Sequence, residues 1–299
     1  MSTIQILALA AATFAASPTP SADQQVLIWR QTRVANLTKA DGWLTLIGLH
    51  WLDKPRASIG NGKANAIDLG AGPAQLGEIL LSPQRALTLK IAPGAKVQVD
   101  GKAASGSVPL LSDAGGATAT QVMFGTVSFS VISRGDRIGL RVKDSTAATR
   151  TGFEGLDYFD YDPKWRIEGK FERYAKPRTL DVVSIIGTVE PTPNPGRAVF
   201  THEGRSYSLE LLEGSDDQHF FTVFGDRTNG KESYGMARFL AGSLAPGAQT
   251  VVLDFNTAYN PPCAFTPYAT CPMPPDGNRL DVAVRAGERK YAEEVASAP

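Results

Sequence analysis

The sequence predicts a mostly β protein of one or two antiparallel sandwich-like or barrel-like halves, with a short helix near the N-terminus. Three observations favour this fold class. A helical period of apolar residues occurs only in residues 23–39, and beyond residue 52 short apolar runs alternate with Gly, Pro, Asn and Asp. The 29 glycines and 20 prolines suit many short strands and turns. At 299 residues the chain is long enough for one large domain or two of ordinary size.

The N-terminal stretch predicts export. An apolar run followed by small residues resembles a signal peptide covering residues 1–22, although its start lacks Lys and Arg. A frayed apolar N-terminus is the alternative. No other run reaches the ~18–20 apolar residues that span a bilayer, so we expect no integral membrane segment after signal cleavage. The predicted location is periplasmic or secreted, where disulfides form.

The first predicted half covers residues 23–164. It starts with the helix at 23–39, for which Asp23 is the expected N-cap. An aromatic-rich run at 43–52 follows, expected as a strand or strand pair that bends at Gly48. Further strands are expected at 66–69, 78–81, 87–91, 97–99, 121–124, 127–132 and 138–142.

The second predicted half covers residues 165–299, after a connecting segment rich in aromatics. Asn229-Gly230 predicts a hairpin turn between apolar runs. Strands are expected at 165–174, 181–189, 197–201, 205–212, 219–224, 233–239, 250–255 and 279–286.

Charge and motif content exclude several function classes. Acidic and basic residues balance at 30 each, which gives no electrostatic drive toward nucleic acid. Three separated histidines form no metal motif, so neither a metal nor a cofactor is predicted. Residues 225–232 nearly match a phosphate-binding loop, but Glu232 stands where Ser or Thr is needed.

Residues 254–278 are the most unusual stretch of the sequence. They hold both cysteines, six prolines and three asparagines, and no Lys, Arg or Glu. Proline fixes φ and removes a backbone donor, so this stretch is neither a regular helix nor a central strand. Its aromatics and Pro-Pro steps argue against disorder. We therefore expect an ordered loop that forms one wall of a site.

Polar side chains around this loop suggest a small-molecule pocket. The first hypothesis is that the protein binds, and in its stronger form hydrolyses, a small polar ligand such as a carbohydrate derivative. Asp254 and Asp226 would serve as acid and base. The residues expected to bind the ligand are Arg238, Tyr234, Asn256, Tyr259, Asn260, Asn278 and Glu288.

A second hypothesis gives the same residues a structural role. Arg238 on a strand with carboxylates nearby is equally typical of an ion pair that holds a loop. The protein would then be a non-catalytic binding or scaffold module whose rigid loop is recognised by a partner. Whether it is an enzyme stays open at this stage.

Cys263 and Cys271 are spaced too widely for half of a zinc site. In an exported protein they are expected to form a disulfide that stabilises the fold by roughly 2–3 kcal/mol. Thiol chemistry is the alternative, and it would need a lowered thiol pKa.

Two family resemblances follow from longer stretches. The sequence pattern of residues 57–69 and 97–102 resembles that of a forkhead-associated sandwich. Asn61 stands where that family has Arg, so the resemblance implies only the fold. The whole mature chain resembles the family called domain of unknown function 1684. The stretches that carry this resemblance are 29–30, 41–52, 138–144, 225–240, 254–272, 278–280 and 286–288. The family name implies no activity.

Overall fold

The computed structural model describes residues 20–176, 178–216 and 218–291. The protein is mostly β, with several antiparallel sheets and one N-terminal helix, as the sequence predicts. Residues 1–19 of the predicted export signal lie outside the described residues. Among the described helices, none is both long enough and apolar enough to cross a bilayer.

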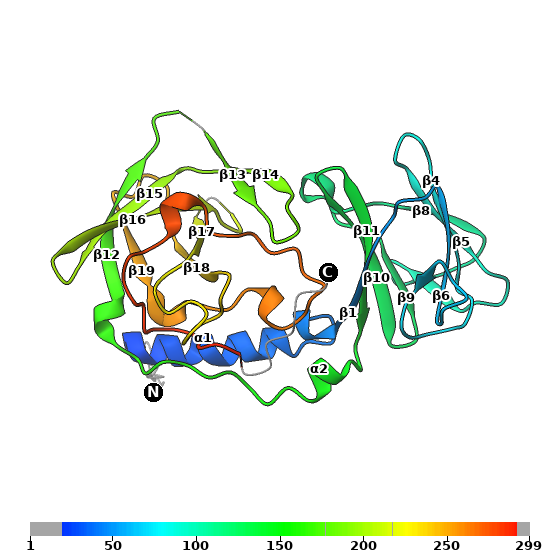
Figure 1. Cartoon of the computed structure of the whole chain (residues 1–299), viewed down its shortest axis with the longest axis horizontal. Helices are drawn as coiled ribbons and strands as arrows, with labels where there is room; N and C mark the ends of the chain where they lie inside the picture. The colour runs from blue at the N-terminus through cyan, green and yellow to red at the C-terminus, as the bar shows by residue number, and fades with distance from the viewer. Residues whose placement is uncertain (1–19, 177, 217, 292–299) are drawn as a thin grey trace, which may run out of the picture.

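The N-terminal helix, α1, spans Ala22–Leu37. The predicted N-cap is wrong by two residues: the cap is Ser21, whose backbone N–H donates to Gln24 Oε1 at 3.0 Å. The sequence groups this helix with the first half, yet it lies along the second half (Figure 1). Arg33 of α1 forms an ion pair of 2.8 Å with Glu288, which explains this placement.

The first half is a sandwich of two sheets (Figure 1). In spatial order, the first sheet holds β1 (Leu46–Trp51), β11 (Arg137–Asp144), β10 (Val127–Arg134), β9 (Gln121–Phe124), β6 (Val97–Val99) and β7 (Lys102–Ala104). The second holds β3 (Ile67–Asp68), β2 (Arg56–Gly60), β4 (Gly77–Leu81), β5 (Leu87–Ile91) and β8 (Ser107–Leu110).

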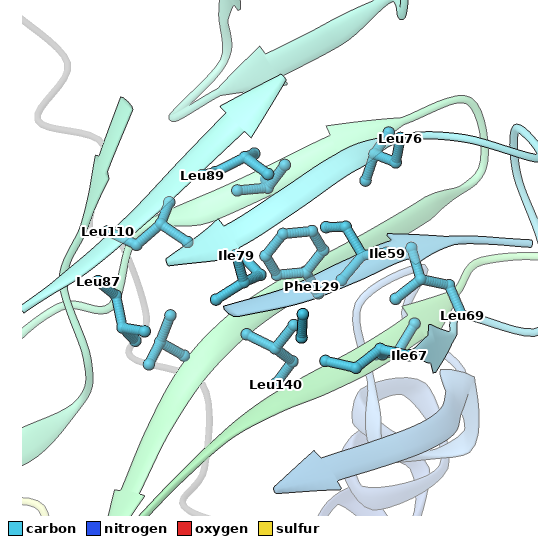
Figure 2. Close-up of a cluster of buried hydrophobic side chains, with 14 of the residues drawn as sticks. Ile59, Ile67, Leu69, Leu76, Ile79, Leu87, Leu89, Leu110, Phe129 and Leu140 are labelled. Carbon is cyan, nitrogen blue, oxygen red and sulfur yellow. The ribbon is translucent and has the colours of Figure 1, made fainter. Parts of the chain in front are cut away.

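Apolar side chains from both sheets meet between them. Figure 2 shows Phe129 and Leu140 of the first sheet packed with Ile59, Ile79 and Leu89 of the second. All five are almost completely buried. The alternation of apolar residues along each strand places one face in this core.

The aromatic run at 43–52 departs from a simple strand. It begins as a 3₁₀ turn, η1 (Trp43–Thr45), and continues as β1. The register of β1 against β11 shifts between Leu46 and Gly48, which is the irregularity expected at this glycine. The turn leaves Trp43 beside the second half, where it contributes to the cavity described below.

The second half is one six-stranded sheet that curls into a nearly closed barrel. In spatial order it holds β18 (Arg238–Ser243), β17 (His219–Phe224), β16 (Arg205–Glu213), β15 (Gly196–His202), β12 (Arg166–Arg173) and β19 (Thr250–Asp254). A separate hairpin, β13 (Thr179–Val183) and β14 (Val189–Pro193), extends toward the first half (Figure 1). The connection between the halves carries the short helix α2 (Ala148–Thr151) and the 3₁₀ turn η3 (Pro163–Trp165).

Three predicted strands of this half are wrong. The run at 181–189 crosses a turn, in which the hydroxyls of Ser184 and Thr188 share a hydrogen bond of 2.7 Å. The run at 233–239 becomes a strand only from Arg238, because the Thr228 carbonyl accepts three backbone N–H groups and closes the preceding loop on itself. Residues 279–286 form no strand, because backbone groups in this segment bond the buried side chains of Asp226 and Arg238 instead.

Candidate functional site

Residues 254–278 form an ordered and largely buried loop, as predicted. Three 3₁₀ turns shape it: η4 (Phe255–Thr257), η5 (Pro262–Ala264) and η6 (Asp276–Asn278). The sulfur atoms of Cys263 and Cys271 lie at disulfide-bonding distance, with their Cα atoms 6.2 Å apart. The bond braces the middle of the loop.

Arg238 and Asp226, predicted as ligand clamp and acid–base group, form an ion pair inside the protein. Both side chains have no exposed surface, and Arg238 Nη1 lies 3.1 Å from Asp226 Oδ2. The guanidinium also donates to the carbonyls of Val284 (2.8 Å) and Ala286. Asp226 Oδ1 accepts from the backbone N–H of Thr228 at 2.7 Å. The pair therefore fastens two irregular segments together.

Glu288 and Asn260 belong to a second buried network. The Glu288 carboxylate pairs with Arg33 and accepts the Asn260 N–H at 2.7 Å. The Arg33 guanidinium lies 4.7 Å from the centre of the Tyr259 ring, and burial raises the pKa of that phenol. These contacts hold α1 against the loop.

Asp254, Asn256 and Asn278 also have partners within the protein. Asp254 pairs with Arg166 at 3.0 Å. Both amide atoms of Asn256 bond the backbone of Asp162 at 3.0 Å.

The amide of Asn278 serves as a junction between strands. Its Oδ1 accepts from the Glu210 N–H at 2.7 Å, and its Nδ2 donates to Thr222 Oγ1 at 3.0 Å. Tyr234, 7% exposed, packs in the apolar cluster that contains both cysteines.

The predicted site residues are thus buried at separate points along the loop and its neighbours. Asp226 and Asp254 have different basic partners, and neither lines the cavities described here. The catalytic roles assigned to these two carboxylates stay a prediction. The geometry instead favours the structural interpretation of Arg238 as the partner that holds a loop.

A cavity of about 380 Å³ lies where the loop meets the first half. The loop supplies one wall and the outer face of the β10–β11 pair supplies another. Its lining residues are Trp43, Asp113, Arg134, Arg141, Glu190, Phe239, Pro262, Ala269, Thr270, Cys271 and Pro272. The loop was predicted to form one wall of a pocket, but none of the residues predicted to bind the ligand lines this cavity. We call this the arginine cavity.

Thr270 is the link between the two arginines. Arg134 Nε and Arg141 Nη2 each donate to its hydroxyl oxygen at 3.2 Å. A hydroxyl oxygen accepts two hydrogen bonds and donates one, so its proton remains as a donor toward the cavity. Arg134 is already neutralised by Asp113, whose carboxylate oxygens lie 2.9 and 3.0 Å from its guanidinium.

Arg141 forms no such ion pair within the described residues, and the charge of Asp113 acts on it only from beyond ion-pair distance. It is only 9% exposed, and it forms no ion pair with any carboxylate of the described residues. Its Nε is buried without a hydrogen-bond acceptor, and the centre of the Trp43 ring lies 5.3 Å from its guanidinium carbon. Burial, aided by the charge of Arg134, lowers the pKa of Arg141 to about 10, so the group is charged at neutral pH.

Sequence reasoning missed Arg134, Arg141 and Trp43 as site residues. A signal was present: in the apolar run at 138–142, Leu140 and Val142 point into the core, so Arg141 points to the opposite face. A basic residue in the middle of an apolar strand indicates a second buried surface. The sequence alone does not indicate which segment of the chain covers that surface.

These features define a mostly β protein with an arginine-lined cavity beside a braced loop. The family described as "Protein of unknown function (DUF1684)" matches residues 151–289, and the chain belongs to this family. The match contains the loop and all of the residues predicted for the site.

A solved structure and a sequence search complete the comparisons. The chain is similar, at 31% identity, to an uncharacterized protein of Haloarcula marismortui whose structure was determined by solution NMR. The alignment covers 48% of this chain and 80% of that one, with a TM-score of 0.40. A search of curated proteins found no match.

Proposed function

We propose that the protein binds a small polar ligand carrying a carboxylate or a phosphate in the arginine cavity. The observation that carries the proposal is Arg141, a cation nine-tenths buried with no carboxylate partner among the described residues. A buried charge without a partner is costly, and a bound anion would complete its coordination. The planar guanidinium suits two-point binding of a carboxylate or phosphate.

The cavity also has the size and polar groups for such a ligand. Its volume of about 380 Å³ lies within the range of small-molecule sites. The Thr270 proton is available to an anionic oxygen, and Trp43 offers a flat apolar wall. An acidic carbohydrate derivative, such as a sugar acid or sugar phosphate, fits these requirements better than a neutral sugar.

Binding rather than hydrolysis is the function that we propose. The carboxylates that line the cavity are Asp113, which is engaged by Arg134, and Glu190, which is exposed on β14. Asp226 and Asp254, the carboxylates predicted to be catalytic, do not line this cavity. We therefore adopt the first hypothesis from the sequence in its weaker form, which is binding of a small polar ligand without hydrolysis.

We also propose that the protein works outside the cytoplasm, in the periplasm or as a secreted protein. Support comes from the apolar N-terminus in the sequence and from the bonded positions of Cys263 and Cys271.

The binding proposal can be tested with four probes: phosphate, acetate, glucuronate and uncharged glucose. Calorimetry and tryptophan fluorescence would measure affinity for the wild type, Arg141→Gln and Arg137→Gln. Arg137 is a matched control on the same strand, exposed and stacked on Trp51 at 4.0 Å.

We expect the three anions to bind and glucose to bind more weakly. Arg141→Gln should weaken anion binding by about ten- to a hundredfold, because it removes a charged hydrogen-bond donor. Arg137→Gln should have no effect. Equal affinity of glucose and glucuronate, or unchanged anion binding by Arg141→Gln, would contradict the proposal.

A further inference from the structure

A smaller cavity of about 150 Å³ adjoins the arginine cavity. The two share three lining residues, Glu190, Thr270 and Pro272. Because the same three residues line both spaces, the second space is adjacent to the cavity that contains Arg141. We call this second space the apolar cavity.

The lining of the apolar cavity is different in chemistry from that of the arginine cavity. Its lining includes the apolar side chains of Val182, Leu212 and Phe221, and the first two are 5% and 2% exposed. Thr192 and the shared Glu190 and Thr270 also line it. The Ser184 hydroxyl, which also faces it, is already hydrogen-bonded to Thr188 at 2.7 Å. Such a lining favours apolar groups over hydroxyls.

The walls of the two cavities are physically continuous. Phe221 lines the apolar cavity and Phe239 lines the arginine cavity, and the two rings make an edge-to-face contact with centres 4.9 Å apart. Backbone hydrogen bonds hold the loop to the hairpin beside them: Ile185 N–H donates to the Cys271 carbonyl at 2.8 Å. Both spaces are therefore built on one braced assembly.

We propose that the ligand of the arginine cavity is amphipathic, with its anionic group at Arg141 and a short apolar group in the apolar cavity against Val182, Leu212 and Phe221. This inference rests on the proposed function, and it specifies the ligand class as anions with a short alkyl or aromatic substituent. The small volume of the apolar cavity limits the substituent to a few carbon atoms.

A chain-length series tests the inference. Calorimetry would compare acetate, butanoate, hexanoate and decanoate, which share one head group. Burial of each methylene is expected to raise affinity about fourfold until the chain fills the cavity, after which the gain should stop.

Two variants that introduce the same side chain at neighbouring positions show where the apolar group of the ligand binds. Val182→Phe fills the apolar cavity and should bind hexanoate no better than acetate, while acetate binding stays unchanged. Val183→Phe is the matched control, because Val183 lies on the opposite face of β13 and is 39% exposed. Val182→Thr keeps the side-chain shape and adds a hydroxyl, so it should weaken hexanoate binding without the risk of overpacking.

The outcomes separate this inference from the proposed function. If acetate binds through Arg141 but longer chains bind with equal affinity, the amphipathic ligand is wrong and the anion site stands. If Val182→Phe and Val183→Phe weaken hexanoate equally, the apolar group lies elsewhere. If none of these carboxylates, nor phosphate or glucuronate, binds the wild type, both proposals fail.

Discussion

Arg238 and Arg141 are both buried arginines, but their surroundings differ in one respect. Arg238 pairs with the buried carboxylate of Asp226 and donates to three backbone carbonyls. Among the described residues, the Arg141 side chain makes one hydrogen bond, to a threonine hydroxyl, and no ion pair with a carboxylate. Both guanidinium groups leave Nε buried without a hydrogen-bond partner among the described residues, so the difference between them is the ion pair that Arg238 forms and Arg141 lacks.

This difference shows how to separate structural arginines from ligand-binding ones. Burial alone does not distinguish them, since both side chains are largely removed from solvent. The available partners distinguish them. An arginine whose charge is paired with a carboxylate inside the protein gains nothing from a bound anion, whereas an arginine without such a partner gains the full interaction. Substitution of Arg238 should therefore reduce stability, whereas substitution of Arg141 should reduce anion binding.

The largest expected effect is on stability. Arg238→Met should lower the free energy of unfolding by about 3–5 kcal/mol, because it leaves the Asp226 carboxylate buried and alone. Arg141→Met should change it by less than about 1 kcal/mol, since the side chain that it removes neutralises no carboxylate. Urea unfolding followed by circular dichroism measures both.

A larger loss of stability in Arg141→Met than in Arg238→Met would contradict this comparison of the two arginines. A strongly destabilised Arg141→Met would mean that Arg141 is a structural residue, and the anion site would lose its main support. Asp226→Asn serves as an additional control, because it should destabilise the protein in the same direction as Arg238→Met.

A smaller effect is expected from the disulfide, which braces the loop beside the arginine cavity. Replacing Cys263 and Cys271 together by Ser should lower the free energy of unfolding by roughly 2–3 kcal/mol, because the unfolded chain gains entropy. Anion affinity should fall as well, since Thr270 adjoins Cys271 in the cavity wall.

Reductant provides the control for this prediction. Dithiothreitol should shift the urea midpoint of the wild type toward that of the double variant and leave the double variant unchanged. A wild type that is insensitive to reductant would contradict a stabilising disulfide.

Local patterns in the sequence were sufficient for much of the fold. The predicted runs at 97–99 and 121–124 are the strands β6 and β9, because alternation and turn residues act over a few positions. Short strands without an apolar run, such as β7 (Lys102–Ala104), left no such pattern and were missed.

The partners of the site residues could not be predicted, because they lie far apart in the chain. Arg238 bonds a carbonyl 46 positions away, and Arg141 meets Thr270 across 129 positions. Sequence patterning indicates that an arginine lies on a strand face, but only the tertiary fold determines whether a carboxylate reaches it. Arg238 was therefore assigned to the ligand, and Arg141 was overlooked.

The smallest expected effect is the pH dependence of anion affinity, which tests the role of the Arg141 charge. The pKa of Arg141 is lowered to about 10, mainly by burial, so the group is a cation at pH 7–9 and loses its proton as the pH rises through 10. Only the cation attracts an anion, so affinity should be constant from pH 7 to 9 and then fall by up to tenfold per pH unit above about 10. Isothermal calorimetry with acetate, which is fully ionised over this whole range, measures this profile.

Arg141→Lys tests whether this residue causes the decline. Lysine has an ordinary pKa about two units below that of arginine, and the same burial lowers it further, so the decline should begin at a correspondingly lower pH. Arg137→Lys should leave the profile unchanged, because that side chain is exposed. A profile that Arg141→Lys does not move would assign the titration to another group and would remove Arg141 from contact with the anion.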